Sequence, residues 1–124
     1  MVKATFGLDE NIASAACYVL TWITGIIFFV MEKDNKTVRF HAMQSILTFL
    51  PLTILWWILG TIYSMMIIGA GIYGAIGIWG ILSLITLLIA IIMLLLWLFL
   101  MFKAYQGEKF LIPIVGAIAE NQVK

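Results

Sequence analysis

The side chains that could do chemistry are concentrated in one short stretch, Arg39-Phe40-His41-Ala42-Met43-Gln44-Ser45, which gathers a guanidinium, an imidazole, a carboxamide and a hydroxyl. His41, Gln44, Ser45 and Thr48 are spaced so that they share one face of an α-helix. An imidazole at this place has the chemistry of a proton-handling or pH-sensitive group. Proton relays in membranes normally include a buried carboxylate, and the apolar sequence after His41 has none. A His41 that hydrogen-bonds a loop or a lipid headgroup is therefore the favoured interpretation.

Few residue types that catalysis needs are present. The chain contains one His and one Cys, and no Asp or Glu lies between Phe40 and Phe102. This composition excludes the usual nucleophile–base triads, zinc sites and carboxylate pairs. Cys17 is the single cysteine, so it can form no intramolecular disulfide. We therefore expect a non-enzymatic protein without catalytic residues, cofactor or metal. The net charge of +1 gives no basic field for nucleic acid.

The composition is that of a membrane protein. The chain is 65% hydrophobic and 10% charged, whereas soluble domains carry about 25% charged residues. From Phe40 to Phe102 there is no Asp, Glu, Lys or Arg at all. Polar surface could not cover such a stretch in water, but a lipid bilayer is its natural solvent. We expect a single membrane domain over residues 1–124.

The hydrophobic runs predict an all-α fold with three transmembrane helices, at about residues 11–31, 41–68 and 75–102. A glycine-rich turn at Gly69–Gly74 separates the second and third helices, and Pro51 predicts a kink in the second. A further apolar run at about 110–119 is too short to cross a bilayer about 30 Å thick. This run predicts a short C-terminal helix that is interfacial or re-entrant.

The basic residues predict the orientation in the cell membrane. Lys33, Lys36 and Arg39 form the densest basic cluster, and positive loops stay in the cytoplasm. With three spans, this places the C-terminus in the cytoplasm and the N-terminus outside. Arg39 itself reads as an anchor that reaches toward lipid phosphate.

A second polar face is expected on the first span. Ser14, Tyr18 and Thr21 lie three or four positions apart, and so on one side of a helix. Gln44, one turn inside the second span, needs a hydrogen-bond partner. Thr21 and Thr24 could supply it, as could a second subunit. The first interpretation of the stripe from His41 to Thr48 is a helix–helix contact, and the second is a shallow polar vestibule open to the cytoplasm.

Several of these segments resemble a known family. They are Leu8-Asp9-Glu10-Asn11, Tyr18 to Gly25, Val38 to Ser45, and Gly107 to Gly116. The chain resembles a family of small uncharacterised prokaryotic membrane proteins that is distantly similar to the Tic-Twenty subunit of the chloroplast inner-envelope translocon. The resemblance implies an all-α membrane fold and, for the chloroplast relative, a part in protein translocation. Three expected spans depart from the four of that relative.

The sequence thus favours a non-enzymatic integral membrane protein that assembles with itself or with a membrane-protein partner, with a role related to protein translocation or insertion. One alternative is an oligomeric small-solute or ion channel or transporter, in which several copies would enclose the path. Another is an accessory subunit that stabilises a larger complex.

Overall fold

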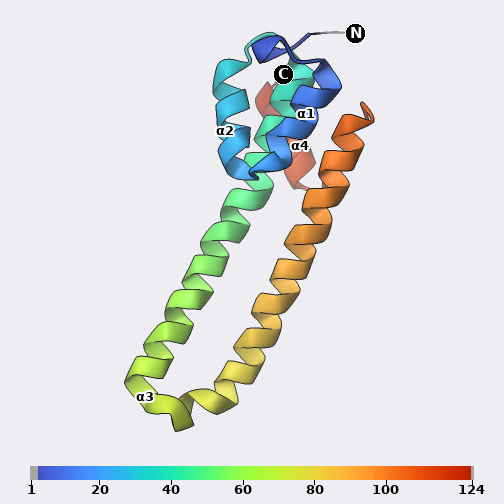
Figure 1. Ribbon diagram of the computed structural model, residues 1–124. Helices are drawn as coiled ribbons and strands as arrows, with labels where there is room; N and C mark the ends of the chain where they lie inside the picture. Colours follow the sequence, from blue (N-terminus) through green and yellow to red (C-terminus); the bar gives the residue numbers. More distant parts are fainter. Residues whose placement is uncertain (1–2, 124) are drawn as a thin grey trace. The chain divides into compact units, whose positions relative to one another are not determined.

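The computed structural model describes residues 3–123, with the side chains of all of these except 5, 70, 72–75, 78 and 79. A 3-10 helix, Thr5–Gly7, precedes four α-helices (Figure 1): α1 at Glu10–Val19, α2 at Trp22–Met31, α3 at Lys36–Tyr105 and α4 at Val115–Val123. The described residues form no strand, so the all-α prediction is confirmed.

The chain divides into two compact units. Unit 1 comprises Met1–Leu50 and Leu95–Lys124, and unit 2 comprises Pro51–Leu94. The boundary falls at Pro51, where a kink is predicted. The backbone keeps helical dihedral angles there, so the missing N–H of Pro51 does not break α3, as is common for prolines in membrane helices.

A break after ten residues replaces the single helix predicted at 11–31. Thr21 has φ 56° and ψ −125°, which ends α1 and starts α2, and the two helices pack side by side in unit 1 (Figure 1). Local hydrogen bonds explain the break, because the Thr24 hydroxyl accepts from the Leu20 N–H at 3.1 Å and donates to the Cys17 carbonyl at 3.1 Å. Each ten-residue helix is about 15 Å long, half the thickness of the hydrocarbon layer.

The long helix α3 is a hairpin of two helical stretches. Gly71, with φ 70°, takes a backbone conformation that costs glycine little, and it breaks the helix inside the predicted turn. Within the described residues, Lys36–Gly69 and Gly80–Tyr105 are long and apolar enough to cross a membrane, with mean hydropathies of 1.8 and 3.1. They contain the predicted spans 41–68 and most of 75–102. Two candidate membrane spans are thus found in the described residues, and the third is not confirmed.

Unit 1 is held together by side chains buried between α1, α2 and α3. Tyr18, Phe40 and Phe49 are fully buried there. Gly25 of α2 allows a close approach to α3, since a Cβ at this position would lie 2.9 Å from the Ala42 carbonyl oxygen. Small residues at such contacts let helices in membranes approach closely.

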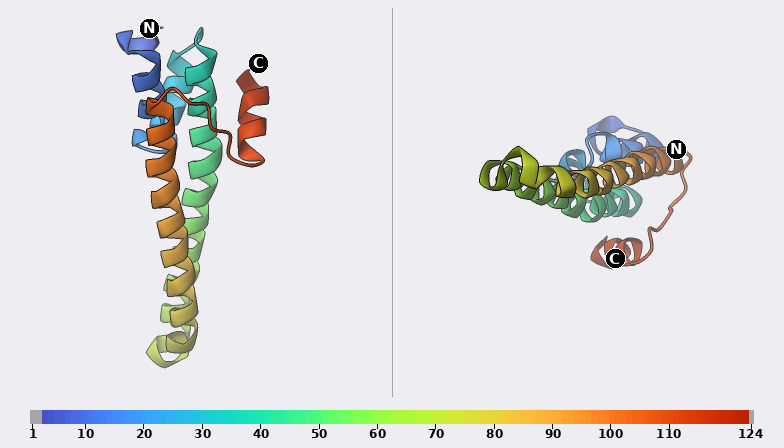
Figure 2. Two further views of the ribbon diagram at one scale, coloured as in Figure 1. Left: turned by 90° about the vertical axis from the view of Figure 1, so that its right-hand side faces the viewer. Right: turned by 90° about the horizontal axis from the view of Figure 1, so that it is seen from below.

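The C-terminal segment begins without helix. The predicted helix at 110–119 starts later, at Val115, and runs to Val123. A Cβ atom added at Gly116 would lie 2.6 to 2.8 Å from atoms of Leu111. The segment therefore folds tightly back on itself. In unit 1, α4 lies beside the first stretch of α3 (Figure 2), and Ala119 and Val123 pack against Phe40. Contact with lipid by this helix stays a prediction.

Candidate functional site

A buried polar cluster lies where α1 meets the first turns of α3. The Tyr18 hydroxyl is 2.9 Å from His41 Nδ1, and Gln44 Nε2 donates to the same hydroxyl at 3.1 Å. All three residues are at most 2% exposed. In the tautomer of His41 that has no proton on Nδ1, the Tyr18 hydroxyl donates to this nitrogen. A neutral His41 then carries its proton on Nε2.

Burial also fixes the protonation of the α1 partners of this cluster. It raises the pKa of the Tyr18 hydroxyl far above its usual range. The Cys17 thiol, buried one position earlier, has its pKa raised for the same reason and donates to the Ala13 carbonyl at 3.3 Å. Both groups therefore stay neutral hydrogen-bond donors, and Cys17 is not a reactive thiol.

Gln44 also holds the C-terminal segment. Its Nε2 donates to the Phe110 carbonyl at 3.0 Å, and its Oε1 accepts from the Ile112 N–H at 3.1 Å. These two bonds explain why the helix starts only after this segment, because the backbone of Phe110 and Ile112 is engaged with a side chain. The partners of Gln44 are thus Tyr18 and the C-terminal segment, and not the predicted Thr21 or Thr24.

The other stripe residues differ in how they are bonded. Ser45 donates to the Thr21 carbonyl at 2.7 Å and so ties α3 to the break between α1 and α2. Thr48 and Ser14 are buried, and neither hydroxyl has a hydrogen-bond partner. Of the eight polar residues predicted for the site, the structure thus joins Tyr18, His41, Gln44, Ser45 and Thr21 in hydrogen bonds at one junction.

Arg39 lies apart from this junction. Its Nη1 donates to the Phe29 carbonyl at 2.9 Å and to the Glu32 carbonyl at 2.6 Å, at the C-terminal end of α2. Its guanidinium also stacks 4.2 Å above the Phe29 ring. A cation at a helix C-terminus is favoured by the helix dipole and by the free carbonyls there. Arg39 therefore caps α2 in this structure, and its reach toward lipid phosphate stays a prediction.

Two parts of the cluster are not predicted from the sequence. Trp97 Nε1 donates to the Tyr18 carbonyl at 2.5 Å, which joins the second stretch of α3 to α1. The indole N–H of a tryptophan in an apolar stretch needs a hydrogen-bond partner. The presence of Trp97 in the sequence could therefore have predicted such a bond. The carbonyl of Phe110 and the N–H of Ile112 offer no such signal, because every residue has a backbone.

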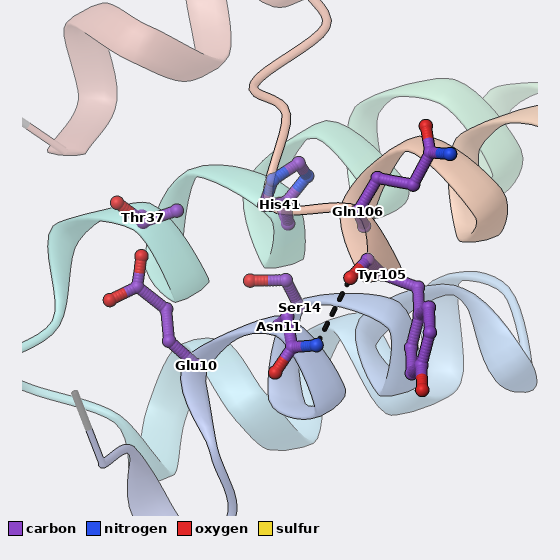
Figure 3. A pocket seen from close by; sticks show the side chains of 9 residues that line it. Glu10, Asn11, Ser14, Thr37, His41, Tyr105 and Gln106 are labelled. Carbon is purple, nitrogen blue, oxygen red and sulfur yellow. Dashed lines mark hydrogen bonds between the residues drawn. The ribbon is translucent and has the colours of Figure 1, made fainter. Parts of the chain in front are cut away.

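A cavity of about 410 Å³ opens beside this cluster within unit 1 (Figure 3). It is lined by Glu10, Asn11, Ser14, Thr37, His41 and residues 104–107. Asn11 Nδ2 donates to the Tyr105 carbonyl at 3.1 Å across it. Among the residues that the structure describes, no three His, Cys, Asp or Glu side chains group as metal ligands.

A helical hairpin of spanning length whose residues 40–102 carry no charge, in a chain of this hydrophobicity, defines a small integral membrane protein. The sequence model of the magnetosome magnetite crystal formation protein family matches residues 9–119, and the chain belongs to that family. Relatives bear the name UPF0132 membrane protein. One from Methanocaldococcus jannaschii is 42% identical over 98% of this chain and 94% of its own, and one from Archaeoglobus fulgidus is 37% identical over 94% and 97%. No solved structure is significantly similar to the chain.

These relatives confirm a family of small prokaryotic membrane proteins, and they confirm the membrane location. A second M. jannaschii protein of the same name, 40% identical over 93% of this chain, agrees with them. The further similarity to the Tic-Twenty subunit is not shown by them and stays a prediction.

Proposed function

We propose that this chain is a non-enzymatic membrane protein that acts by assembling with copies of itself in the bilayer. The observation that carries the proposal is a hollow on unit 2, on the first stretch of α3. Gly60 and Ser64, one helical turn apart, are exposed and both line it. The hollow measures about 600 Å³ and is lined by Trp56, Trp57, Gly60, Thr61, Ser64, Met65 and Ile68.

Small residues one turn apart are what helix pairs in membranes use. A Cβ at Gly60 would meet no atom within 4 Å, so the surface there is open. The Ser64 hydroxyl donates to the Gly60 carbonyl of its own helix at 2.9 Å, so this hydroxyl already has a partner. In lipid, where apolar side chains gain little from leaving the solvent, close packing of backbones at such positions drives association.

A second copy of the chain is the occupant that this surface fits best. The same Gly60–Ser64 pair on two copies can meet about a twofold axis, since one patch then contacts itself. The sequence carries the signal as Gly-Thr-Ile-Tyr-Ser at 60–64. The matching family is described by its part in magnetosome magnetite crystal formation, which supports a role by assembly.

The alternative of an oligomeric small-solute or ion channel or transporter has less support. Two of the hydroxyls exposed on unit 2, those of Thr61 and Ser64, bond carbonyls of their own helix. The polar cluster of unit 1 is occupied by internal partners. A part in protein translocation or insertion would be one use of the assembly, and it rests on the resemblance to the Tic-Twenty subunit.

The proposal includes a topology. All seven Lys and Arg residues fall within the sequence ranges of unit 1, at 3, 33, 36, 39, 103, 109 and 124. The positive-inside rule assigns the segments that carry these basic residues to the cytoplasmic side of the membrane. Since α1 and α2 are each too short to cross, the N-terminus returns to the side of the Glu32–Asn35 loop. We infer that both termini are cytoplasmic, in place of the predicted external N-terminus.

Cysteine crosslinking in native membranes tests the assembly. Ser64→Cys should give a covalent dimer of the chain under oxidation, because the two copies meet at this surface. Leu84→Cys, 68% exposed on the other stretch of unit 2, is the control and should give none. The native Cys17 is fully buried and should form no crosslink.

A second pair of variants separates self-assembly from a partner. Gly60→Leu fills the hollow and should abolish the Ser64→Cys dimer, whereas Gly80→Leu, at another open glycine, should leave it. Crosslinks from position 64 to one defined other protein, with no dimer, would overturn self-assembly and make the chain an accessory subunit. Crosslinks to many passenger polypeptides would instead indicate translocation or insertion.

A further inference from the structure

The cavity beside α1 has the features of a built binding site. Ser14 is 1% exposed, and its hydroxyl has no hydrogen-bond partner. Figure 3 shows this hydroxyl directed into the opening between Glu10, Thr37 and His41. In the same wall, Asn11 donates through Nδ2 but its buried Oδ1 is unpartnered. Buried polar atoms are rarely left unpaired, so two at one cavity indicate a ligand or ordered water.

The charge of the lining selects the kind of ligand. Of the residues that line the cavity, Glu10 alone carries a formal charge at neutral pH with His41 neutral. Its Oε2 accepts from Asn35 Nδ2 at 3.1 Å, which holds the carboxylate at the edge of the opening. The Ser14 hydroxyl, which is directed into the opening, can accept a hydrogen bond. The lining is therefore acidic and offers an acceptor beside the carboxylate.

We propose that this cavity binds a primary ammonium group. Such a group has a positive charge for Glu10 and three N–H donors for the surrounding oxygens. A metal ion fits poorly, because no three His, Cys, Asp or Glu side chains group together in the described residues. The cavity volume of about 410 Å³ is also far larger than the volume of one ordered water molecule, which is about 30 Å³.

Two sources could supply this chemistry. One is the ethanolamine headgroup of a phospholipid, since the charged N-terminal end of α1 and the start of α3 are expected at the headgroup level. The other is a small soluble amine from the cytoplasm. The binding chemistry is the same in both cases, and the experiment is arranged to separate them.

The test uses the full-length protein. For the lipid, the protein is reconstituted with equal phosphatidylethanolamine and phosphatidylcholine, and the lipids retained after mild extraction are measured by native mass spectrometry. Phosphatidylcholine has the same headgroup charge but no N–H donor, so it controls for charge alone. For the soluble source, ethanolamine is titrated by calorimetry into protein in a phosphatidylcholine bilayer.

Three variants accompany each measurement. Glu10→Gln removes the charge and should weaken binding about tenfold or more, as expected for a charged hydrogen bond. Ser14→Ala removes one hydroxyl with little change of shape and should weaken it about fivefold. Asp9→Asn is the matched control, because that carboxylate is adjacent in sequence but pairs with Lys3 at 2.6 Å and does not line the cavity.

Selective retention of phosphatidylethanolamine that falls in Glu10→Gln and Ser14→Ala, but not in Asp9→Asn, supports the proposal and assigns the lipid source. Binding of ethanolamine with the same dependence supports it and assigns the soluble source. Absence of both, or equal losses in Glu10→Gln and Asp9→Asn, would overturn it and leave a water-filled cavity. Should Glu10→Gln fail to fold, Ser14→Ala and Asp9→Asn still decide between these outcomes.

Discussion

Gln44 Oε1 accepts a hydrogen bond from the Ile112 N–H at 3.1 Å, and this bond joins two residues that lie 68 positions apart in the sequence. The same carboxamide reaches the Phe110 carbonyl and the Tyr18 hydroxyl. One fully buried side chain thus links α1, α3 and the C-terminal segment. A polar residue at the start of a membrane span here serves to fix three separate parts of one chain.

Gln44→Leu should loosen this junction. Leu has a similar volume, but it would leave the Phe110 carbonyl and the Ile112 N–H, which are partly buried, without this partner. Each such group costs about 1–3 kcal/mol, so we expect a loss of unfolding free energy of about 2–4 kcal/mol. Limited proteolysis after residue 107 should become faster. Gln106→Leu, the same change at an exposed residue, should alter neither measurement.

Tyr18→Phe tests the other side of the junction. The ring and its packing remain, but His41 Nδ1 and one Gln44 N–H lose their partner. The expected loss of unfolding free energy is about 1–3 kcal/mol, measured by thermal unfolding in detergent. Tyr105→Phe, at a side chain that is 59% exposed, is the matched control. Equal stability of the two variants would contradict the hydrogen-bonded chain.

The parts of this fold that the sequence predicts are those set by strong local signals. Uninterrupted apolar residues give the two stretches of α3, and the glycines around Gly71 give the turn between them. Gln44 is recognised as a residue that needs a partner, because a buried carboxamide is costly alone. Its actual partners follow from tertiary packing, and two of them are backbone groups with no sequence signature.

The break at Thr21 shows where sequence patterns fail. Leu20-Thr21-Trp22 contains neither Gly nor Pro, so the apolar run reads as one spanning helix. Competing hydrogen bonds from the Thr24 hydroxyl, and the Ser45 bond to the Thr21 carbonyl, stabilise the reversal instead. Threonines spaced along an apolar run predict one polar helix face, whereas here they terminate the helix.

Gly25→Ala should disturb the contact of α2 with α3. The added methyl group would lie 2.9 Å from the Ala42 carbonyl oxygen, in a place where little can move. Overpacking of this kind costs about 1–3 kcal/mol, to be measured as a fall in unfolding free energy. Gly77→Ala adds the same methyl group where no atom lies within 4 Å, and it should be neutral or slightly stabilising. A neutral Gly25→Ala would mean that α2 does not pack as described.

The last prediction concerns which side of the membrane each end occupies, and it decides between two and three spans. Single cysteines at Lys3, Glu108 and Gly69 are labelled with an impermeant maleimide, from outside intact cells and in inverted vesicles; buried Cys17 should not react. Because α1 and α2 are each too short to cross, Lys3→Cys and Glu108→Cys should react only in inverted vesicles. Gly69→Cys, beside the uncharged turn, should react from outside. Labelling of Lys3→Cys from outside would instead require α1 and α2 to open into one crossing helix.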